Sequence, residues 1–231
     1  MGSKLGFVTV SDDIYLNGQY QKVMGTGVIS LMWKFIHATM ERPFREMEFE
    51  KILELGAGNG EHLPHVKSKY STYFATDLRL APLKKLAGVP GLQIAKIDAS
   101  KINFPDKHFA RTIVSCVLAH VITPVKAISE IHRVTEPGGY ITIYLPCEPG
   151  ILLRFTRMLT TVPKNKKLGI TDPYYQHYQE HHNYYLSLNH YIKSEYVQDS
   201  VRTRYYPFPF LSWNFNLFKI YQIKLKSIQD N

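Results

Sequence analysis

ILELGAGNGEH, residues 52–62, is the stretch of sequence that decides the fold. It begins as an apolar strand pattern whose single acid is Glu54, and it turns at three glycines that alternate with other residues, Gly56, Gly58 and Gly60. Glycine adopts positive φ without strain and places no side chain between the backbone and a ligand. A strand that runs into a glycine-rich turn is typical of sites where the backbone approaches a nucleotide closely. A tight turn without a ligand is the alternative.

Two further patterns extend this stretch into a repeating unit. A helical pattern through Leu63, Val66 and Tyr70 follows the glycines, and Ser71–Thr76 is a second strand pattern that ends at Asp77. Asp77 lies about 20 positions after the first glycine, the interval at which the second strand of a βαβ unit presents an acid to ribose hydroxyls. The sequence therefore predicts a ligand that contains a ribose, held by the turn and by Asp77.

The spacing of the glycines separates two kinds of nucleotide-binding turn. A dinucleotide-binding turn reads GxGxxG, whereas residues 56–60 read GxGxG, with an acid two residues before the first glycine. This arrangement resembles motif I of the class I S-adenosylmethionine-dependent methyltransferases. The resemblance implies that the turn holds the amino-acid end of S-adenosylmethionine and that the acid after strand two holds its ribose. The cofactor-binding residues implied in this way are Glu54, Gly56, Ala57, Gly58, Asp77 and Leu78.

The next repeat resembles the same family. A helical pattern over residues 80–86 precedes a third strand, Gly91–Ile97, which ends at Asp98 and Ala99. In the resembled family the acid after strand three receives the adenine amino group, so both residues are expected at the cofactor. The alternative is that Asp98 caps the turn that follows it.

The fourth strand pattern, Thr112–Val117, ends beside a candidate for catalysis. Its lead-in resembles that of the family, except that Ala110 stands where Asp is usual, and Ser115 is expected near the cofactor. His120 follows at the place where open α/β sheets bind ligands, outside the carboxyl ends of the strands. An imidazole accepts a proton near neutral pH, so His120 is predicted to be a general base or a substrate ligand. A helix-capping or core histidine is the alternative.

The rest of the chain favours a methyltransferase sheet. A helix over residues 127–134, a turn at 136–139 and a strand at Tyr140–Leu145 continue the resemblance, which spans residues 50–145. The segments Val201–Tyr206 and Phe215–Leu225 alternate as a hairpin. In the resembled family a hairpin lies beside strand five. The expected fold is therefore α/β: a Rossmann-like seven-stranded methyltransferase sheet in the order 3-2-1-4-5-7-6, with strand 7 antiparallel and helices on both faces. A nicotinamide enzyme is disfavoured.

A single methyltransferase domain is expected over residues 1–231. Its four segments are an N-terminal helical cover, a cofactor-binding core, a substrate-binding insertion and a C-terminal β-hairpin, at residues 1–50, 50–145, 146–198 and 199–231. Comparable extensions in the resembled family fold over the cofactor. Tyr15 or Tyr20 is therefore expected to face the sulfonium through its ring, and Tyr20 is the candidate on the substrate side.

The acceptor is expected to bind to residues 146–198, where the family pattern stops. ILLRFTRMLTTV, residues 151–162, is a basic amphipathic pattern that suits packing on the sheet, an anion site or a membrane surface. Candidate substrate ligands are Arg154, Arg157 and His177. His177 and His181 face one way at helical spacing, and His181 and His182 are candidate bases that compete with His120. No metal is expected, because the HExxH order is absent.

Composition bounds the partners and the location. The 231-residue chain has a net charge of +9, 45% hydrophobic residues and two cysteines. The charge favours an anionic or sugar-containing small-molecule acceptor, and the scattered basic residues favour no specific nucleic acid. The two cysteines and the lack of an apolar run of membrane-spanning length favour a cytoplasmic protein, with peripheral membrane contact left open.

These observations converge on an expected activity. By resemblance, the protein is a methyltransferase that uses S-adenosyl-L-methionine and methylates a small-molecule acceptor. The segments PCEPG and SWNFNLFKIYQIKL are similar to small bacterial methyltransferases of surface-glycan pathways, so the acceptor expected is a hydroxyl of a sugar or glycan precursor. The alternatives are an RNA methyltransferase and a cofactor-binding module without catalysis.

Overall fold

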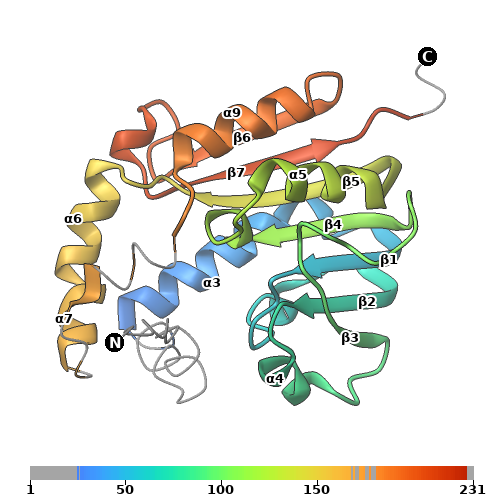
Figure 1. Ribbon diagram of the computed structural model, residues 1–231, viewed down its shortest axis with the longest axis horizontal. Coiled ribbons are helices and arrows are strands. Elements are labelled where there is room, and N and C mark those ends of the chain that lie inside the picture. Colours follow the sequence, from blue (N-terminus) through green and yellow to red (C-terminus); the bar gives the residue numbers. More distant parts are fainter. Residues whose placement is uncertain are drawn as a thin grey trace, which may run out of the picture.

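A seven-stranded sheet with helices on both faces forms the centre of the computed structural model (Figure 1). The structure describes residues 25, 27–167, 169, 172–174, 177 and 181–227. The strands lie in the order β3-β2-β1-β4-β5-β7-β6. Strands β1 to β5 pair in parallel, and β7 is antiparallel to both β5 and β6, which confirms the predicted sheet. Their bounds are β1 (Glu48–Leu55), β2 (Lys69–Asp77), β3 (Leu92–Lys96), β4 (Phe109–Ser115), β5 (Thr135–Pro146), β6 (Ser200–Tyr206) and β7 (Phe218–Lys224).

Burial explains why the central strands read as apolar runs. Strand β1 alternates exposed and buried residues at its start and is buried over its last four, where it lies between β2 and β4. A strand covered on both faces needs apolar side chains on both. Helices α5 (Pro124–Val134) and α9 (Tyr185–Glu195) pack on one face, and α3 (Gly27–Glu41) and α4 (Leu80–Leu83) pack on the other.

The helix predicted after the glycine turn is wrong. Residues 63–65 form a single 3₁₀ turn, with Pro64 in its first positions, and the backbone is already extended at Val66. Strand β2 then starts at Lys69, and Tyr70 pairs with Phe49 of β1. Because β2 begins so soon after the glycines, the chain has no room for a helix of several turns and a return to the sheet. The turn therefore lies at no long helix N-terminus, where a macrodipole would favour an anion.

Several other boundaries differ from the predicted ones. The helical pattern at 80–86 forms α4 and a 3₁₀ turn at Lys84–Leu86, and the basic pattern at 151–162 forms two helices, α6 (Ile151–Leu159) and α7 (Thr161–Lys167). Strand β4 ends at Ser115, and a 3₁₀ turn at Val117–Ala119 replaces its expected last residues. Tyr15 and Tyr20 lie outside the described residues. Within them, no helix has the length and apolar character to cross a bilayer.

A buried ion cluster joins α3 to the sheet. Arg111 of β4 donates to Glu41 at the end of α3 through both terminal nitrogens, at 2.9 and 2.6 Å, and both side chains are almost fully buried. Nε2 of His62, just after the glycine turn, lies 2.8 Å from the same carboxylate, and its Nδ1 lies 2.8 Å from Nδ1 of His37. The guanidinium also lies over the ring of Phe44, 3.8 Å from its centroid. Polar contacts therefore fix α3 beneath the glycine turn.

Candidate functional site

The glycine turn follows β1 at the carboxyl edge of the parallel strands. Gly56 has a φ of +71°, and a Cβ on it would lie 2.2 Å from Cγ2 of Val117. The backbone N–H of Gly58 donates to Oδ2 of Asp77 at 3.1 Å, and that of Arg79 donates to Oδ1 at 2.9 Å. The turn after β1 and the acid at the end of β2 are thus one hydrogen-bonded unit.

This unit fits the cofactor that the resemblance implies. The turn has no side chain at Gly56 or Gly58, and the space beside Gly56 is too small for a Cβ. The Asp77 carboxylate, 9% exposed, can accept the hydroxyl hydrogens of a ribose in addition to its two backbone donors. Both features suit S-adenosylmethionine, because a bare backbone turn can approach its amino-acid end and a carboxylate can bind its ribose.

The remaining candidates for the cofactor have varied surroundings. Asp98 accepts hydrogen bonds from the backbone N–H and the hydroxyl of Ser100, at 2.8 and 2.7 Å, and these bonds lower its pKa. It therefore caps its own turn, as the alternative interpretation held, and its contact with adenine stays a prediction. Ala99 is buried beside it, Leu78 is largely exposed and Ser115 is half-buried at the end of β4.

Glu54 lies under the turn rather than at an open surface. Its side chain is 1% exposed, and the hydroxyl of Tyr73 donates to it at 2.7 Å. Burial raises the pKa of this carboxyl. The contact joins β1 to β2 directly beneath the glycines, so Glu54 supports the turn from within. A direct contact with the cofactor stays a prediction.

A second group of polar side chains gathers where β4 and β5 end. We call it the His–Glu cluster, and it comprises Glu148, Arg157, His177, His181 and His120. Glu148 accepts hydrogen bonds from Arg157 at 2.7 Å and from Nδ1 of His181 at 2.5 Å, and it also contacts Nε2 of His177. The ring of His120 meets that of His181 edge to face, with 4.5 Å between centroids. Four elements thus supply one cluster: the ends of β4 and β5, α6 and the segment before α9.

The electrostatics of the cluster favour a proton acceptor. Burial alone would raise the pKa of Glu148, but the hydrogen bonds from His177 and His181 and the charge of Arg157 hold it well below its usual range. Burial lowers the pKa of His181, although Glu148 opposes the shift. The carboxylate at Nδ1 assigns the proton of a neutral imidazole to that nitrogen. Nε2 of His181 is then left with a lone pair that can accept a proton.

Two candidates lie outside the cluster. His182 directly follows His181 in the sequence, but its side chain is exposed, and Arg154 of α6 is exposed as well. Conversely, the sequence interpretation did not select Glu148, although it follows strand five directly, at the edge where ligands bind. An acid directly after strand five is the sequence feature that could have marked Glu148 as a candidate site residue.

The cluster also includes donor atoms that a metal ion could use. The donor atoms of Glu148, His177 and His181 lie within 4.8 Å of one another, and so do those of His181, His120 and Cys116. However, the guanidinium of Arg157 donates to Glu148 at 2.7 Å and lies 2.5 Å from Nε2 of His177, so a positive charge already occupies the first group. Burial raises the pKa of the Cys116 thiol to about 12, and a thiol is a far weaker ligand than a thiolate. The donor set therefore fits a divalent cation poorly.

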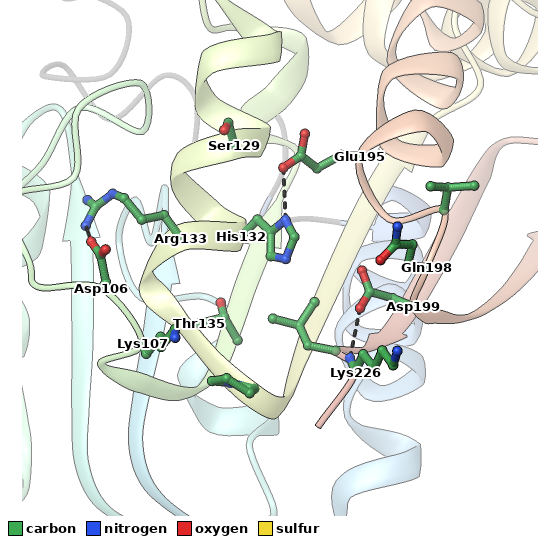
Figure 2. A pocket seen from close by; sticks show the side chains of 13 residues that line it. Asp106, Lys107, Ser129, His132, Arg133, Thr135, Glu195, Gln198, Asp199 and Lys226 are labelled. Carbon is green, nitrogen blue, oxygen red and sulfur yellow. Dashed lines mark hydrogen bonds and ion pairs between the residues drawn. The ribbon is translucent and has the colours of Figure 1, made fainter. Parts of the chain in front are cut away.

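A surface pocket between α5 and α9 is not part of this site. Figure 2 shows its polar side chains, which come from the loop before β4, the last turns of α5, the start of β5, the end of α9 with the residues that follow it, and the segment after β7. Most of them are paired: His132 with Glu195 at 2.9 Å and Arg133 with Asp106 at 2.6 Å. The pocket lies at the opposite edge of the sheet from the glycine turn, and its charged groups stabilise the surface.

Comparison with known proteins supports one class of enzyme. Residues 53–143 match the family model of a methyltransferase domain. The demethylmenaquinone methyltransferase of Clavibacter sepedonicus is 32% identical over 98 residues, which are 41% of this chain and 40% of that protein. The chain thus matches less than half the length of that curated relative. S-adenosylmethionine is the cofactor that the family match and the fold indicate.

Solved structures show the same fold over most of the chain. A putative S-adenosylmethionine-dependent methyltransferase from Methanococcus maripaludis has a TM-score of 0.62, 15% identity and 98% coverage of both chains. The trans-methyltransferase CalH, solved with SAH, has a TM-score of 0.57 and 15% identity, with 94% of this chain and 66% of that chain covered. The chain thus contains a stretch that matches a methyltransferase domain, and it shares the fold of solved methyltransferases.

Proposed function

We propose that this protein transfers the methyl group of S-adenosylmethionine to a hydroxyl of a small-molecule acceptor, and that the acceptor is a sugar or glycan precursor. The observation that carries the proposal is the Glu148–His181 pair, which lies at the same edge of the sheet as the glycine turn. Val117 connects the two groups, because it follows β4 between the turn at Gly56 and the cluster at His120.

Each residue has a defined role in the proposed reaction. The cofactor supplies an electrophilic methyl group, which the acceptor oxygen approaches in line from the side opposite the leaving sulfur. The glycine turn holds the amino-acid end of the cofactor and Asp77 holds its ribose, which fixes the position of the reacting carbon. Nε2 of His181 takes the hydroxyl proton, while Glu148 keeps the other ring nitrogen protonated and stabilises the imidazolium that forms. His120 lies against the same ring and is the second candidate base.

The chemistry of the cluster favours an oxygen acceptor with polar neighbours. Imidazole, carboxylate and guanidinium groups all face one another there, and such groups can hydrogen-bond several hydroxyls of a sugar. The exposed Arg154 adds positive charge nearby, which suits an acceptor that carries phosphate. The named activity of the Clavibacter relative is methylation of demethylmenaquinone, but the match to it covers 41% of this chain.

Methyl transfer from labelled S-adenosylmethionine tests the proposal. The acceptors to screen are nucleotide sugars, lipid-linked sugars, a demethylated quinone and RNA. His181→Ala should lower transfer about 100-fold and leave the affinity for S-adenosylhomocysteine, measured by calorimetry, within twofold. His190→Ala is the matched control, because His190 is an exposed histidine of α9.

Other outcomes would replace parts of the proposal. Loss of transfer in His120→Ala but not in His181→Ala would make His120 the base. Methylation of RNA alone would establish the alternative acceptor, and RNA binding that collapses between low and physiological salt would indicate only charge attraction. Binding of S-adenosylhomocysteine without transfer to any acceptor would favour a cofactor-binding module. Binding of NAD instead of S-adenosylhomocysteine would overturn the assignment of S-adenosylmethionine as the cofactor.

A further inference from the structure

Helix α6 presents its apolar stripe to solvent. Ile151, Phe155, Met158 and Leu159 are 60, 54, 48 and 60% exposed, and their spacing places them on one face of the helix. Only Leu153 of this helix is buried. The apolar stripe of an amphipathic surface helix normally faces the core, so the orientation of α6 is the reverse of the usual one.

Two neighbouring segments add to the same surface. The loop between β6 and β7 contains Phe210 and Phe215, 84 and 50% exposed, and its 3₁₀ turn at Trp213–Phe215 packs against α6. Helix α3 exposes Val28 and Leu31, at 71 and 65%. Figure 1 places α6, the start of α3 and the β6–β7 loop at one end of the molecule. We call the exposed apolar side chains of these three segments the apolar rim.

Charge distinguishes the rim from an ordinary protein contact. The segments 151–167 and 207–217 contain five Arg or Lys and no Asp or Glu, and Arg154, Lys166 and Lys167 are exposed. The exposed Lys34 of α3 adds to this charge. A second copy of the chain docked face to face would bring these like charges together, which disfavours association. An anionic surface with an apolar interior complements both features.

We propose that the apolar rim docks on an anionic lipid bilayer. The aromatic and aliphatic side chains would enter the boundary between headgroups and acyl chains, and the basic side chains would contact the headgroups. Membrane binding of this kind grows with the apolar area buried and with attraction to anionic lipid. Arg157 extends from the same α6 helix into the His–Glu cluster, so docking would place the cluster close to the bilayer surface.

The docking assigns a class of acceptor. A polar cluster beside an apolar, membrane-bound rim fits an amphiphile whose hydroxyl lies in its headgroup, such as a glycan precursor on a lipid. This last step alone rests on the proposed function. The docking itself depends on neither the cofactor nor methyl transfer, so the two proposals can fail separately.

Sedimentation with lipid vesicles tests the docking. The full chain should bind vesicles of phosphatidylcholine with phosphatidylglycerol, bind pure phosphatidylcholine much more weakly, and dissociate as salt rises. Phe155→Asp or Phe210→Asp should lower binding at least tenfold, because each places a charge where the proposed docking would bury an apolar side chain in the bilayer. Lys166→Gln should lower it about fivefold.

Matched controls keep the test decisive. Val197→Asp introduces the same charge at a side chain that is 75% exposed and borders the pocket of Figure 2, at the other edge of the sheet. It should retain wild-type binding, and all variants should retain affinity for S-adenosylhomocysteine, which shows that they are folded. No binding by the wild type, equal binding to neutral vesicles, or equal loss in Val197→Asp would overturn the proposal. A dimer that Phe155→Asp dissolves would do so too, because it would make a second copy the occupant.

Discussion

Nδ1 of His181 donates a hydrogen bond to Oε2 of Glu148 at 2.5 Å, across 33 positions of the chain. This bond fixes the ring orientation and the tautomer of His181, and it joins the segment before α9 to the end of β5. A carboxylate in this position makes the imidazole a stronger base and stabilises the imidazolium. Glu148 is thus a positioning residue for the proposed base.

Glu148→Gln should separate positioning from cofactor binding. We expect methyl transfer to fall about 100-fold, with affinity for S-adenosylhomocysteine unchanged. Because the Glu148 carboxylate raises the pKa of His181 against the effect of burial, its loss should move the acidic limb of the pH–rate profile to lower pH. Glu195→Gln is the matched control, since Glu195 pairs with His132 through the same kind of contact at 2.9 Å on the other edge. An acidic limb that stays in place would remove Glu148 from the mechanism.

A pair of glycines tests the cofactor turn. Gly56 and Gly88 both have positive φ, +71° and +88°, so alanine strains the backbone at each. A Cβ at Gly88 meets nothing within 4 Å, whereas one at Gly56 would meet Val117 at 2.2 Å. Both variants should lose about 1 kcal/mol of unfolding free energy from the backbone.

Only Gly56→Ala should also lose affinity for S-adenosylhomocysteine, by tenfold or more in calorimetric titration, because it displaces the turn or Val117. Equal affinities in the two variants would mean that the cofactor lies elsewhere. A loss in Gly88→Ala alone would point to the same conclusion.

The contact between the glycine turn and Asp77 could be predicted from sequence because the two follow neighbouring strands that are consecutive in the chain. Asp77 ends β2, which pairs with β1, so the turn after β1 lies beside Asp77 and Gly58 donates to it. The His–Glu cluster has no such regularity. Its members come from the segments that follow β4 and β5, from α6 and from the segment before α9, and only the folded chain shows that Glu148 meets His181.

The helix predicted at Leu63–Tyr70 failed for a related reason. Leu63, Val66 and Tyr70 have helical spacing, but Tyr70 belongs to β2, where it pairs with Phe49. Its aromatic side chain therefore reflects packing in the sheet and not one face of a helix. For α6 the sequence predicted the helix but not its orientation. Its amphipathic spacing predicted a helix, but spacing alone does not tell whether the apolar face meets the core or the solvent.

The buried ion cluster should be sensitive to the loss of one partner. Arg111→Met leaves the carboxylate of Glu41 buried without its bidentate donor, and such a change typically costs about 3–5 kcal/mol of unfolding free energy. The double variant Arg111→Met, Glu41→Gln removes both charges and should recover part of this loss. Urea unfolding at a constant m-value measures both.

Lys51→Met is the control for a surface pair, since Lys51 lies 3.1 Å from the largely exposed Glu50 and should cost less than about 1 kcal/mol. A double variant that is less stable than Arg111→Met would show that the charges themselves are not the cause.

Acid should destabilise the fold through His37. Burial, reinforced by the charges of His62 and His65 and opposed by Glu41, lowers the pKa of His37 from 6.5 to about 3. In the unfolded chain His37 binds a proton near pH 6.5, whereas in the folded chain it stays neutral until about pH 3. The free energy of unfolding therefore falls as pH drops below 6.5, and it stops falling near pH 3. The loss should approach about 1.4 kcal/mol per pH unit below pH 6 and reach about 2 kcal/mol between pH 6.5 and 4.5.

The window between pH 6.5 and 4.5 isolates this effect from Glu41. Burial alone would raise the pKa of Glu41, but hydrogen bonds from His62 and Arg111 lower it from 4.5 to about 2, so its stabilisation is lost only below pH 4.5. Urea unfolding across the window should show the slope in the wild type and in His190→Gln, an exposed histidine, and a flatter dependence in His37→Gln. A slope that persists in His37→Gln would assign the acid sensitivity to another group, of which the half-buried His65, whose pKa is lowered in the same direction, is the next to test.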